Sequence, residues 1–174
     1  MRRRSKVNLP LKASIFRSIF ALSLASVLVV PVQADWQMPK VTSLKAVGEQ
    51  AQSANIPVVI FFSRERCGAC DLLKENALLP LVENGLLEGY VEIVEIEANA
   101  KATVLDFDGV AVPNSEMAAL YNVSTFPNMV FTDGTGEDLE IRMKNSGAYD
   151  YFSFYFKARI NQALEKLENP LRIE

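Results

Sequence analysis

The sequence contains no histidine among its 174 residues. Histidine is the usual general base of hydrolases and the commonest protein ligand of transition metals. Its absence excludes a Cys-His hydrolase and a metalloprotease with an HExxH helix. It also removes the side chain that most often acts as a switch near neutral pH.

Cysteine is scarce as well, with only Cys67 and Cys70, separated by Gly68 and Ala69. A structural zinc site needs four ligands, and the sequence has neither a second CxxC nor a histidine to complete one. A two-thiolate copper(I) site stays open as an alternative, with methionines as soft helpers; the candidates are Met117, Met129 and Met143. A purely structural disulfide is another alternative, although it would close a very short loop and stabilise the fold little.

Acidic residues are absent before Asp35, whereas six of the 18 Lys and Arg residues lie there. The apolar run "SIFALSLASVLVV" follows these basic residues, and Val32-Gln33-Ala34 forms a small-residue cleavage site. The run is too short for a membrane-spanning helix, which needs ~20 residues. This pattern predicts a signal peptide over residues 1–34, cleaved near Ala34, and export to the periplasm.

Removal of that segment would leave residues 35–174 with 12 basic and 21 acidic residues, a net charge of −9. A domain this acidic is a poor ligand for nucleic acid or an anionic membrane, so we expect neither as a partner, and no stable membrane insertion after cleavage. An oxidising compartment would also join two close cysteines in a disulfide unless a partner reduces it.

The remaining chain predicts one α/β domain in which helices flank a mixed sheet. "VVIFFS" (58–63) has the continuous apolar character of a strand buried on both faces. "YVEIVEIEA" (90–98) alternates apolar and acidic residues, and "NMVFT" with "EDLEIRM" forms a hairpin around the turn "DGTG". Helices are expected over 43–55, from Cys67 to about residue 79, over 80–89, from Ser115 to Val123, and from Tyr149 to Glu168, and residues 99–114 are expected to be irregular.

The last helix begins with "YDYFSFYF", which has more aromatic residues than one buried face can use. Phe152, Tyr155 and Phe156 are expected in the core. Tyr149, Tyr151 and Phe154 have two open interpretations: an exposed patch for a partner protein, or packing beneath the loop 99–114.

The cysteine pair stands where a buried strand ends and a helix begins. The free amides and the dipole of a helix N-terminus stabilise a thiolate, which is the species that attacks disulfides. Arg64 and Arg66 add positive charge, partly offset by Glu65. Cys67 is therefore the predicted nucleophile, open to an incoming peptide, and Cys70, one turn further on and shielded, the predicted resolving thiol.

Two segments resemble the thioredoxin superfamily: "VVIFFSRERCGACDLL", with its strand, CxxC and helix, and "ALYNVSTFPNMVFTDGTGE". The resemblance implies a thioredoxin fold with an insertion before the strand that follows a cis-proline. It assigns that role to Pro127, with Phe126, Gly68 and Ala69 also contacting substrate. Within the superfamily, the sequence is most similar to the periplasmic thioredoxin-related proteins of the sulfur-oxidation-associated (SoxW-like) branch.

Three residues depart from the family pattern. Arg66 replaces the usual tryptophan before the first cysteine, and Phe61 replaces a buried aspartate that serves as proton acceptor. Glu95, on the adjacent predicted strand, is a candidate replacement for that acceptor, although alternating acids on a strand often form a solvated face. Finally, Gly68-Ala69 lacks the histidine found between the cysteines of strong oxidants, which favours a reductase.

The sequence thus predicts an exported thiol-disulfide oxidoreductase that reduces periplasmic protein disulfides. We expect no organic or metal cofactor, because the dithiol is itself the redox centre. The expected partners are protein disulfides and an upstream thiol-disulfide protein of the membrane or periplasm. A redox-inactive binding module and a copper(I) chaperone remain the alternatives.

Overall fold

The computed structural model describes residues 38, 40–144 and 149–174. The predicted signal peptide, residues 1–34, lies outside the described residues, as does the side chain of Tyr149. Residues Asp35–Glu174 group as one compact unit. Within the described part of the chain, no helix is both long and apolar enough to cross a membrane.

Four strands form a mixed sheet in the order β2-β1-β5-β6. They are β1 (Val58–Ser63), β2 (Glu92–Glu97), β5 (Asn128–Thr132) and β6 (Asp138–Lys144). β1 pairs with β2 in parallel, and the other two pairings are antiparallel. All six residues of β1 are buried because this strand has neighbours on both edges and helices on both faces, which confirms the prediction from its continuous apolar run.

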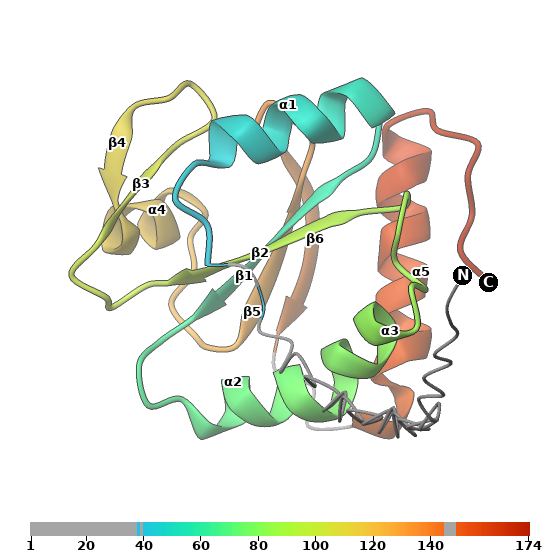
Figure 1. Cartoon of the computed structure of the whole chain (residues 1–174), viewed down its shortest axis with the longest axis horizontal. Helices are drawn as coiled ribbons and strands as arrows, with labels where there is room; N and C mark the ends of the chain where they lie inside the picture. The colour runs from blue at the N-terminus through green and yellow to red at the C-terminus, as the bar shows by residue number, and fades with distance from the viewer. Residues whose placement is uncertain (1–37, 39, 145–148) are drawn as a thin grey trace, which may run out of the picture. The chain divides into compact units, whose positions relative to one another are not determined.

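Helices cover both faces of this sheet (Figure 1). α1 (Leu44–Ala54) lies on one face; Ser43 caps its N-terminus and a left-handed Asn55 ends it. α2 (Gly68–Leu73), α3 (Leu79–Glu83) and α5 (Tyr149–Lys166) lie on the other face. In α5, Phe156 packs edge-on against Phe131 of β5, with ring centroids 6.1 Å apart. This arrangement confirms the predicted mixed sheet flanked by helices.

The helix that begins after Cys67 is less regular than predicted. Between α2 and α3, residues Lys74–Leu78 form a π-helical segment, and Pro80 lies in the first turn of α3. The helical backbone continues without a break from Gly68 to Glu83, so Pro80, which has no N–H to donate, lies within a helical run directly after the π-helical turn. The second helix ends at Glu83, short of the predicted residue 89, and turns with left-handed Gly85 and Gly89 lead into β2.

The expectation of an irregular segment over residues 99–114 is wrong. β3 (Thr103–Leu105) and β4 (Ala111–Pro113) form an antiparallel hairpin. Asp106 closes it, since its carboxylate accepts hydrogen bonds from the backbone N–H groups of Asp108 and Val110. These strands are three residues long, too short for a period-two pattern to stand out in the sequence.

The next helix, α4 (Asn114–Leu120), begins one residue before the expected cap Ser115, with Pro113 as its N-cap. Phe107, in the turn between β3 and β4, packs the hairpin against the rest of the domain. Its ring lies so close to Gly48 of α1 and to Gly136 that a methyl group on either glycine would overlap it. The insertion is therefore a packed subdomain, attached to α1 and to the β5–β6 turn.

The aromatic residues at the start of α5 divide differently from the expectation. Phe152 and Phe156 are buried as predicted, but Tyr155 is 55% exposed, so its assignment to the core is wrong. Tyr151 and Phe154 are also exposed, which excludes packing beneath the 99–114 segment. Helical periodicity places Tyr151, Phe154 and Tyr155 on a different side of α5 from Phe152 and Phe156, which face the sheet.

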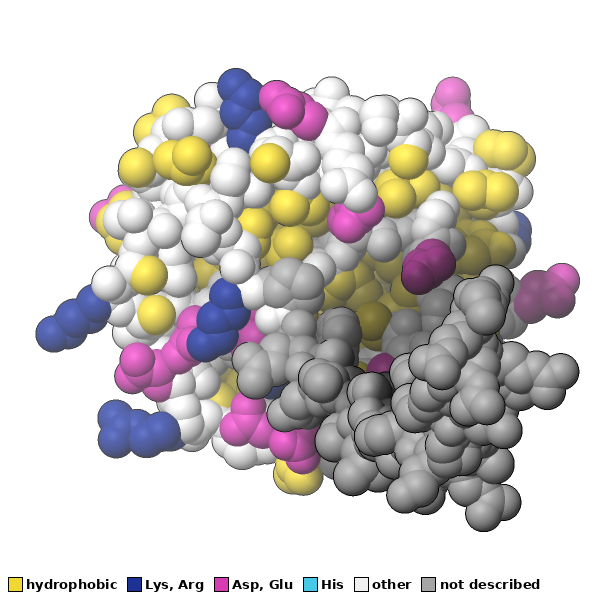
Figure 2. All heavy atoms as spheres, viewed as in Figure 1, with side chains coloured by type: hydrophobic (Ala, Val, Ile, Leu, Met, Phe, Trp, Pro, Cys, Tyr) yellow, Lys and Arg dark blue, Asp and Glu magenta, His cyan; other side chains and the backbone are white. Residues whose placement is uncertain are grey.

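Charges are not spread evenly over the surface. In Figure 2, acidic side chains are scattered across the visible face, whereas most of the Lys and Arg side chains lie on its left half. That half carries the β3–β4 hairpin and the loop between β1 and α2 (Figure 1). The cysteine pair follows this loop.

Candidate active site

The two cysteines form a disulfide at the start of α2. Their sulfurs are 2.11 Å apart and their Cα atoms 5.2 Å apart. Cys67 is the N-cap residue of the helix: its Sγ accepts a hydrogen bond from the backbone N–H of Cys70, at 3.2 Å. The opening amides of the helix therefore point toward the Cys67 sulfur, the position that favours a thiolate after reduction.

Cys67 is less accessible than the sequence suggested. It is 5% exposed, and Cys70 is 1% exposed. The expectation of an open Cys67 is therefore wrong for the disulfide state, in which its sulfur is turned toward Cys70 and the first helical turn. Both of its sequence neighbours, Arg66 and Gly68, are exposed, so Cys67 lies directly beneath the surface.

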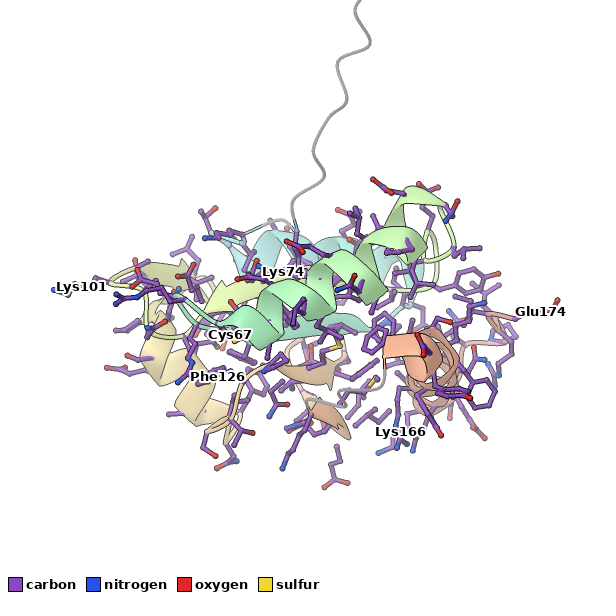
Figure 3. The ribbon with its side chains drawn as sticks, turned by 90° about the horizontal axis from the view of Figure 1, so that it is seen from below. Cys67, Lys74, Lys101, Phe126, Lys166 and Glu174 are labelled. Carbon is purple, nitrogen blue, oxygen red and sulfur yellow. A yellow bond between two sulfur atoms is a disulfide. The ribbon has the colours of Figure 1, made fainter. Side chains whose placement is uncertain are left out.

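The Phe126–Pro127 peptide bond is cis. The strand register aligns Asn128, at the start of β5, with Phe62, near the end of β1. The segment that precedes β5 therefore lies beside the C-terminal end of β1, where the loop to the cysteines begins. Phe126 is labelled close to Cys67 in Figure 3. Phe126 is half-buried and Pro127 is buried.

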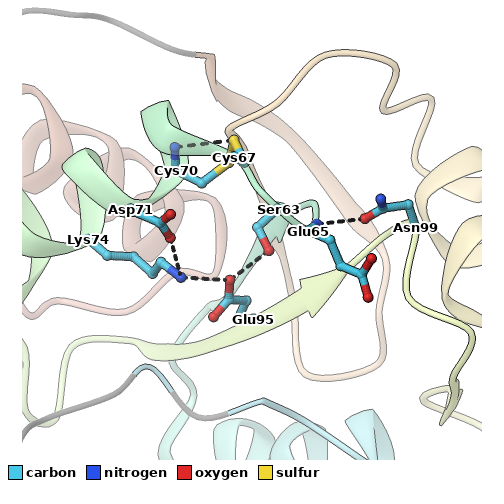
Figure 4. Close-up of a disulfide and its surroundings, with 8 residues drawn as sticks. All are labelled: Ser63, Glu65, Cys67, Cys70, Asp71, Lys74, Glu95 and Asn99. Atoms are coloured by element: carbon cyan, nitrogen blue, oxygen red, sulfur yellow. Dashed lines mark hydrogen bonds and ion pairs between the residues drawn. A yellow bond between two sulfur atoms is a disulfide. The ribbon is translucent and has the colours of Figure 1, made fainter.

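A buried polar network lies beneath the cysteine helix (Figure 4). Glu95 of β2 is 3% exposed, and its Oε1 accepts hydrogen bonds from Ser63 Oγ at 2.6 Å and Lys74 Nζ at 3.2 Å. Lys74 also pairs with Asp71 at 3.3 Å. The network thus connects a carboxylate in the sheet to the helix that carries Cys70.

The sequence predicted that Glu95 could turn inward but did not identify its partners. Ser63 is the last residue of a buried strand, and Lys74 follows Cys70 by four positions, which places both on the same side of the helix. The positions of Ser63 at the strand end and of Lys74 on the helix could be read from the sequence. Their contact with Glu95 could not, because it depends on the parallel pairing of β1 with β2.

The register also explains how a carboxylate can be present although Phe61 occupies the family's aspartate position. Phe61 pairs directly with Glu95 across the two strands. Paired residues of neighbouring strands point to the same face of a sheet. The carboxylate therefore reaches the face covered by α2 from β2, while β1 contributes a fully buried phenyl ring.

No cluster of three or more Cys, Asp or Glu side chains that could hold a metal ion occurs among the described residues. Of the methionines considered as soft ligands, Met117 and Met129 are buried in the core and Met143 packs against it. These side chains fill space in the core, which is the usual role of methionine.

A family model described as a thioredoxin-like domain matches residues 44–151. No curated protein matches the sequence. Among solved structures, one described as a DsbH oxidoreductase is 20% identical, with a TM-score of 0.56, and the match covers 71% of this chain and 85% of that one. A thioredoxin from Fasciola hepatica is 18% identical, with a TM-score of 0.47, and covers 72% and 99% of the two chains. Thioredoxin O2 from Arabidopsis thaliana in its oxidised state is 17% identical, with a TM-score of 0.45, and covers 75% and 93%.

The family match spans the strand that leads to the cysteines, the cysteine pair itself, the polar network and the cis-proline. A close cysteine pair at the N-terminus of a helix is suited to accept and donate two electrons by thiol-disulfide exchange. This chain belongs to the thioredoxin-like domain family, and its Cys67–Cys70 pair makes it a thiol-disulfide oxidoreductase.

Proposed function

We propose that this chain is an exported reductase of protein disulfides in which Cys67 is the nucleophile and Cys70 the resolving thiol. The observation that carries the proposal is the cysteine pair at the start of α2. The Cys67 sulfur accepts a hydrogen bond from a helix amide, and Cys70 is almost fully buried. Gly68-Ala69 between the cysteines supports the reducing direction, because no imidazole is present there to stabilise the thiolate of a strong oxidant.

The reaction consists of two exchange steps. The Cys67 thiolate attacks one sulfur of the target disulfide, that disulfide breaks, and the released target thiolate takes a proton from solvent. Cys70 then loses its proton and attacks Cys67 Sγ, which breaks the mixed disulfide and releases the second target thiol. Two electrons pass to the target, and the chain is left with its Cys67–Cys70 disulfide. A dithiol protein upstream must reduce that disulfide again, and we propose such a partner in the membrane or the periplasm.

Glu95 is the proposed acceptor of the Cys70 proton. It is buried beneath the helix turn that carries Cys70, and its Oε1 accepts a hydrogen bond from Lys74 Nζ. Gly68, Ala69, Phe126 and cis-Pro127 are the proposed contacts for the target chain. Their support is their position around Cys67 and the resemblance to thioredoxins.

The proposed location is the periplasm. Its support is the basic, apolar and small-residue pattern over residues 1–34, followed by a compact acidic domain over residues 35–174. The SoxW-like branch is likewise proposed on sequence resemblance.

Trapping tests the proposal. The Cys70→Ser variant keeps the nucleophile but lacks the resolving thiol, so mixed disulfides between Cys67 and its targets should accumulate. These can be identified by mass spectrometry after non-reducing electrophoresis. The matched control, Cys67→Ser, leaves a thiol that is almost fully buried and should trap nothing. If Cys70→Ser accumulates no adduct, the proposed reductase function is wrong.

The low exposure of Cys67 favours one second candidate, a thioredoxin-like binding module whose disulfide does not turn over. A redox titration separates the two functions. The module requires a reduction potential well below that of thioredoxins, ~−270 mV, and no reduction of insulin. The reductase requires a potential near that value and measurable turnover.

A further inference from the structure

The loop between β1 and α2 presents two arginines at the approach to Cys67. Arg64 and Arg66 are both exposed, and within the described chain neither forms an ion pair or a side-chain hydrogen bond. Arg66 has a φ of 57°, a left-handed conformation that is uncommon for a large side chain and is found mainly in turns and at functional sites. The residue directly before the nucleophile is therefore held in an unusual backbone position.

The loop between β1 and α2 is held by a hydrogen bond to the loop that follows β2. The backbone N–H of Glu65 donates a 2.7 Å hydrogen bond to Asn99 Oδ1, in the loop that follows β2 (Figure 4). Surface charges held on a fixed loop can recognise a partner with a smaller entropy cost than charges on a mobile one.

The acidic member of the loop does not cancel both arginines. Glu65 acts on Lys40, whose pKa is raised first by its hydrogen bond to Glu97 and more weakly by Glu95 and Glu65. The loop therefore has one acid and two arginines that form no ion pair in the described chain, a net charge of +1.

This local positive charge contrasts with the rest of the domain. Residues 35–174 carry a net charge of −9, and acidic side chains are scattered over the face shown in Figure 2. At physiological ionic strength charges are screened over about 8 Å. A group that docks at Cys67 therefore experiences Arg64 and Arg66 and the nearby acids Glu65 and Asp71 more strongly than distant charges. Asp71 is paired with Lys74, whereas the two arginines have no ionic partner in the described chain.

We propose that Arg64 and Arg66 determine substrate specificity by binding an acidic side chain next to the target cysteine in a protein substrate. The inference rests on the proposed reductase function. Guanidinium groups suit this role because they form paired hydrogen bonds with carboxylates. The target segment lies over Gly68, where an added methyl group would meet no atom within 4 Å, and its flanking acid reaches the arginines.

Three synthetic peptide disulfides test the inference. Each is the disulfide dimer of one short peptide with a central cysteine, flanked on both sides by Glu, Gln or Lys. The wild-type chain, kept reduced by a dithiol donor, should reduce the Glu peptide about fivefold faster than the Gln peptide, measured as kcat/KM, and the Lys peptide more slowly still. The Arg64→Gln/Arg66→Gln variant should bring the three rates within about twofold of one another.

Ratios of kcat/KM between peptides separate substrate preference from an effect of the arginines on the Cys67 thiolate. Loss of their charge could lower the reactivity of the Cys67 thiolate, but that change slows all three peptides equally. The matched control, Lys45→Gln/Arg159→Gln, removes the same charge from exposed positions on α1 and α5 and should keep the wild-type preference. Circular dichroism verifies that both double variants are folded.

Equal wild-type rates for the three peptides, or a preference that survives in Arg64→Gln/Arg66→Gln, would overturn the inference and leave the reductase function intact. A loss of preference in the control variant would assign the effect to net charge and also overturn it. Failure of the wild-type chain to reduce any of the peptides would instead count against the proposed function itself.

Discussion

Replacement of Lys74 with methionine is expected to destabilise the fold far more than replacement of its partner Glu95 with glutamine. Lys74 Nζ lies 3.2 Å from Glu95 Oε1, and the two side chains differ in access to water, at 25% and 3% exposed. Methionine preserves the length and apolar contacts of the lysine stem, so the change removes the ammonium group alone.

The magnitudes follow from what each variant leaves behind. Lys74→Met leaves a buried carboxylate with Ser63 as its remaining hydrogen-bond donor. Removal of one partner from a buried ion pair costs about 3 kcal/mol or more, which corresponds to a fall in Tm of about 10 °C for a domain of this size. Glu95→Gln leaves Lys74 with Asp71 and partial access to water, so its cost should be about 1 kcal/mol.

The assay is denaturant unfolding of the oxidised protein at neutral pH, followed by circular dichroism. Lys40→Met provides a matched control, because Lys40 makes a 2.7 Å ion pair with Glu97 but is 69% exposed. Its loss should cost less than about 1 kcal/mol. The double variant Lys74→Met/Glu95→Gln should recover part of the cost of Lys74→Met. If Lys74→Met and Lys40→Met cost the same, or the double variant is simply additive, the buried-pair reasoning is refuted.

Three further predictions concern other parts of the fold. Gly48→Ala should destabilise the domain by about 2 kcal/mol, because its methyl group would lie 2.3 Å from the Gly134 carbonyl oxygen. Gly68→Ala, with open space around it, should unfold like wild type. Equal stabilities of the two variants would contradict this packing. Burial first, then nearby acids, raises the pKa of Tyr121 to about 12 from 10.0, so its contribution to stability is complete below pH 10 and is lost as pH rises toward 12. Tyr121→Phe should remove that alkaline part of the stability profile, and an unchanged profile would refute the assignment. Tyr155→Ser should change the free energy of unfolding by less than about 0.5 kcal/mol, since the side chain is exposed, and a larger loss would show that it packs against the core.

Local sequence patterns were sufficient for the parts of the fold that involve neighbouring residues. The apolar run 58–63 predicted β1, and the motif CGAC placed a redox pair at the start of a helix. Asp133-Gly134 between two alternating segments predicted the β5–β6 hairpin. Each of these features arises from interactions within a few residues, where strand periodicity, turn preferences and helix termini act directly.

The errors occurred where distant segments compete for the same space. Tyr155 was assigned to the core from the number of aromatic residues, but α5 has one buried face and Phe152 and Phe156 occupy it. The β3–β4 hairpin was missed because its stability depends on Phe107 packing against Gly48, more than fifty positions earlier in the chain. The length of the cysteine helix was also misjudged, since the π-helical segment beginning at Lys74 has no signature in propensities.

The amino-acid order was enough to place the cysteine pair between a strand and a helix, because these elements depend on interactions within a few residues, and the resemblance of two segments to thioredoxins implied the fold. Three-dimensional packing settled how that pair is surrounded. Parallel pairing of β1 with β2 brought Glu95 beneath the helix and next to Lys74, and closure of the first helical turn left Cys67 just below the surface. A carboxylate at one position and an ammonium group 21 residues away become partners only when the sheet and the helix meet, since their attraction depends on distance and burial and not on sequence separation.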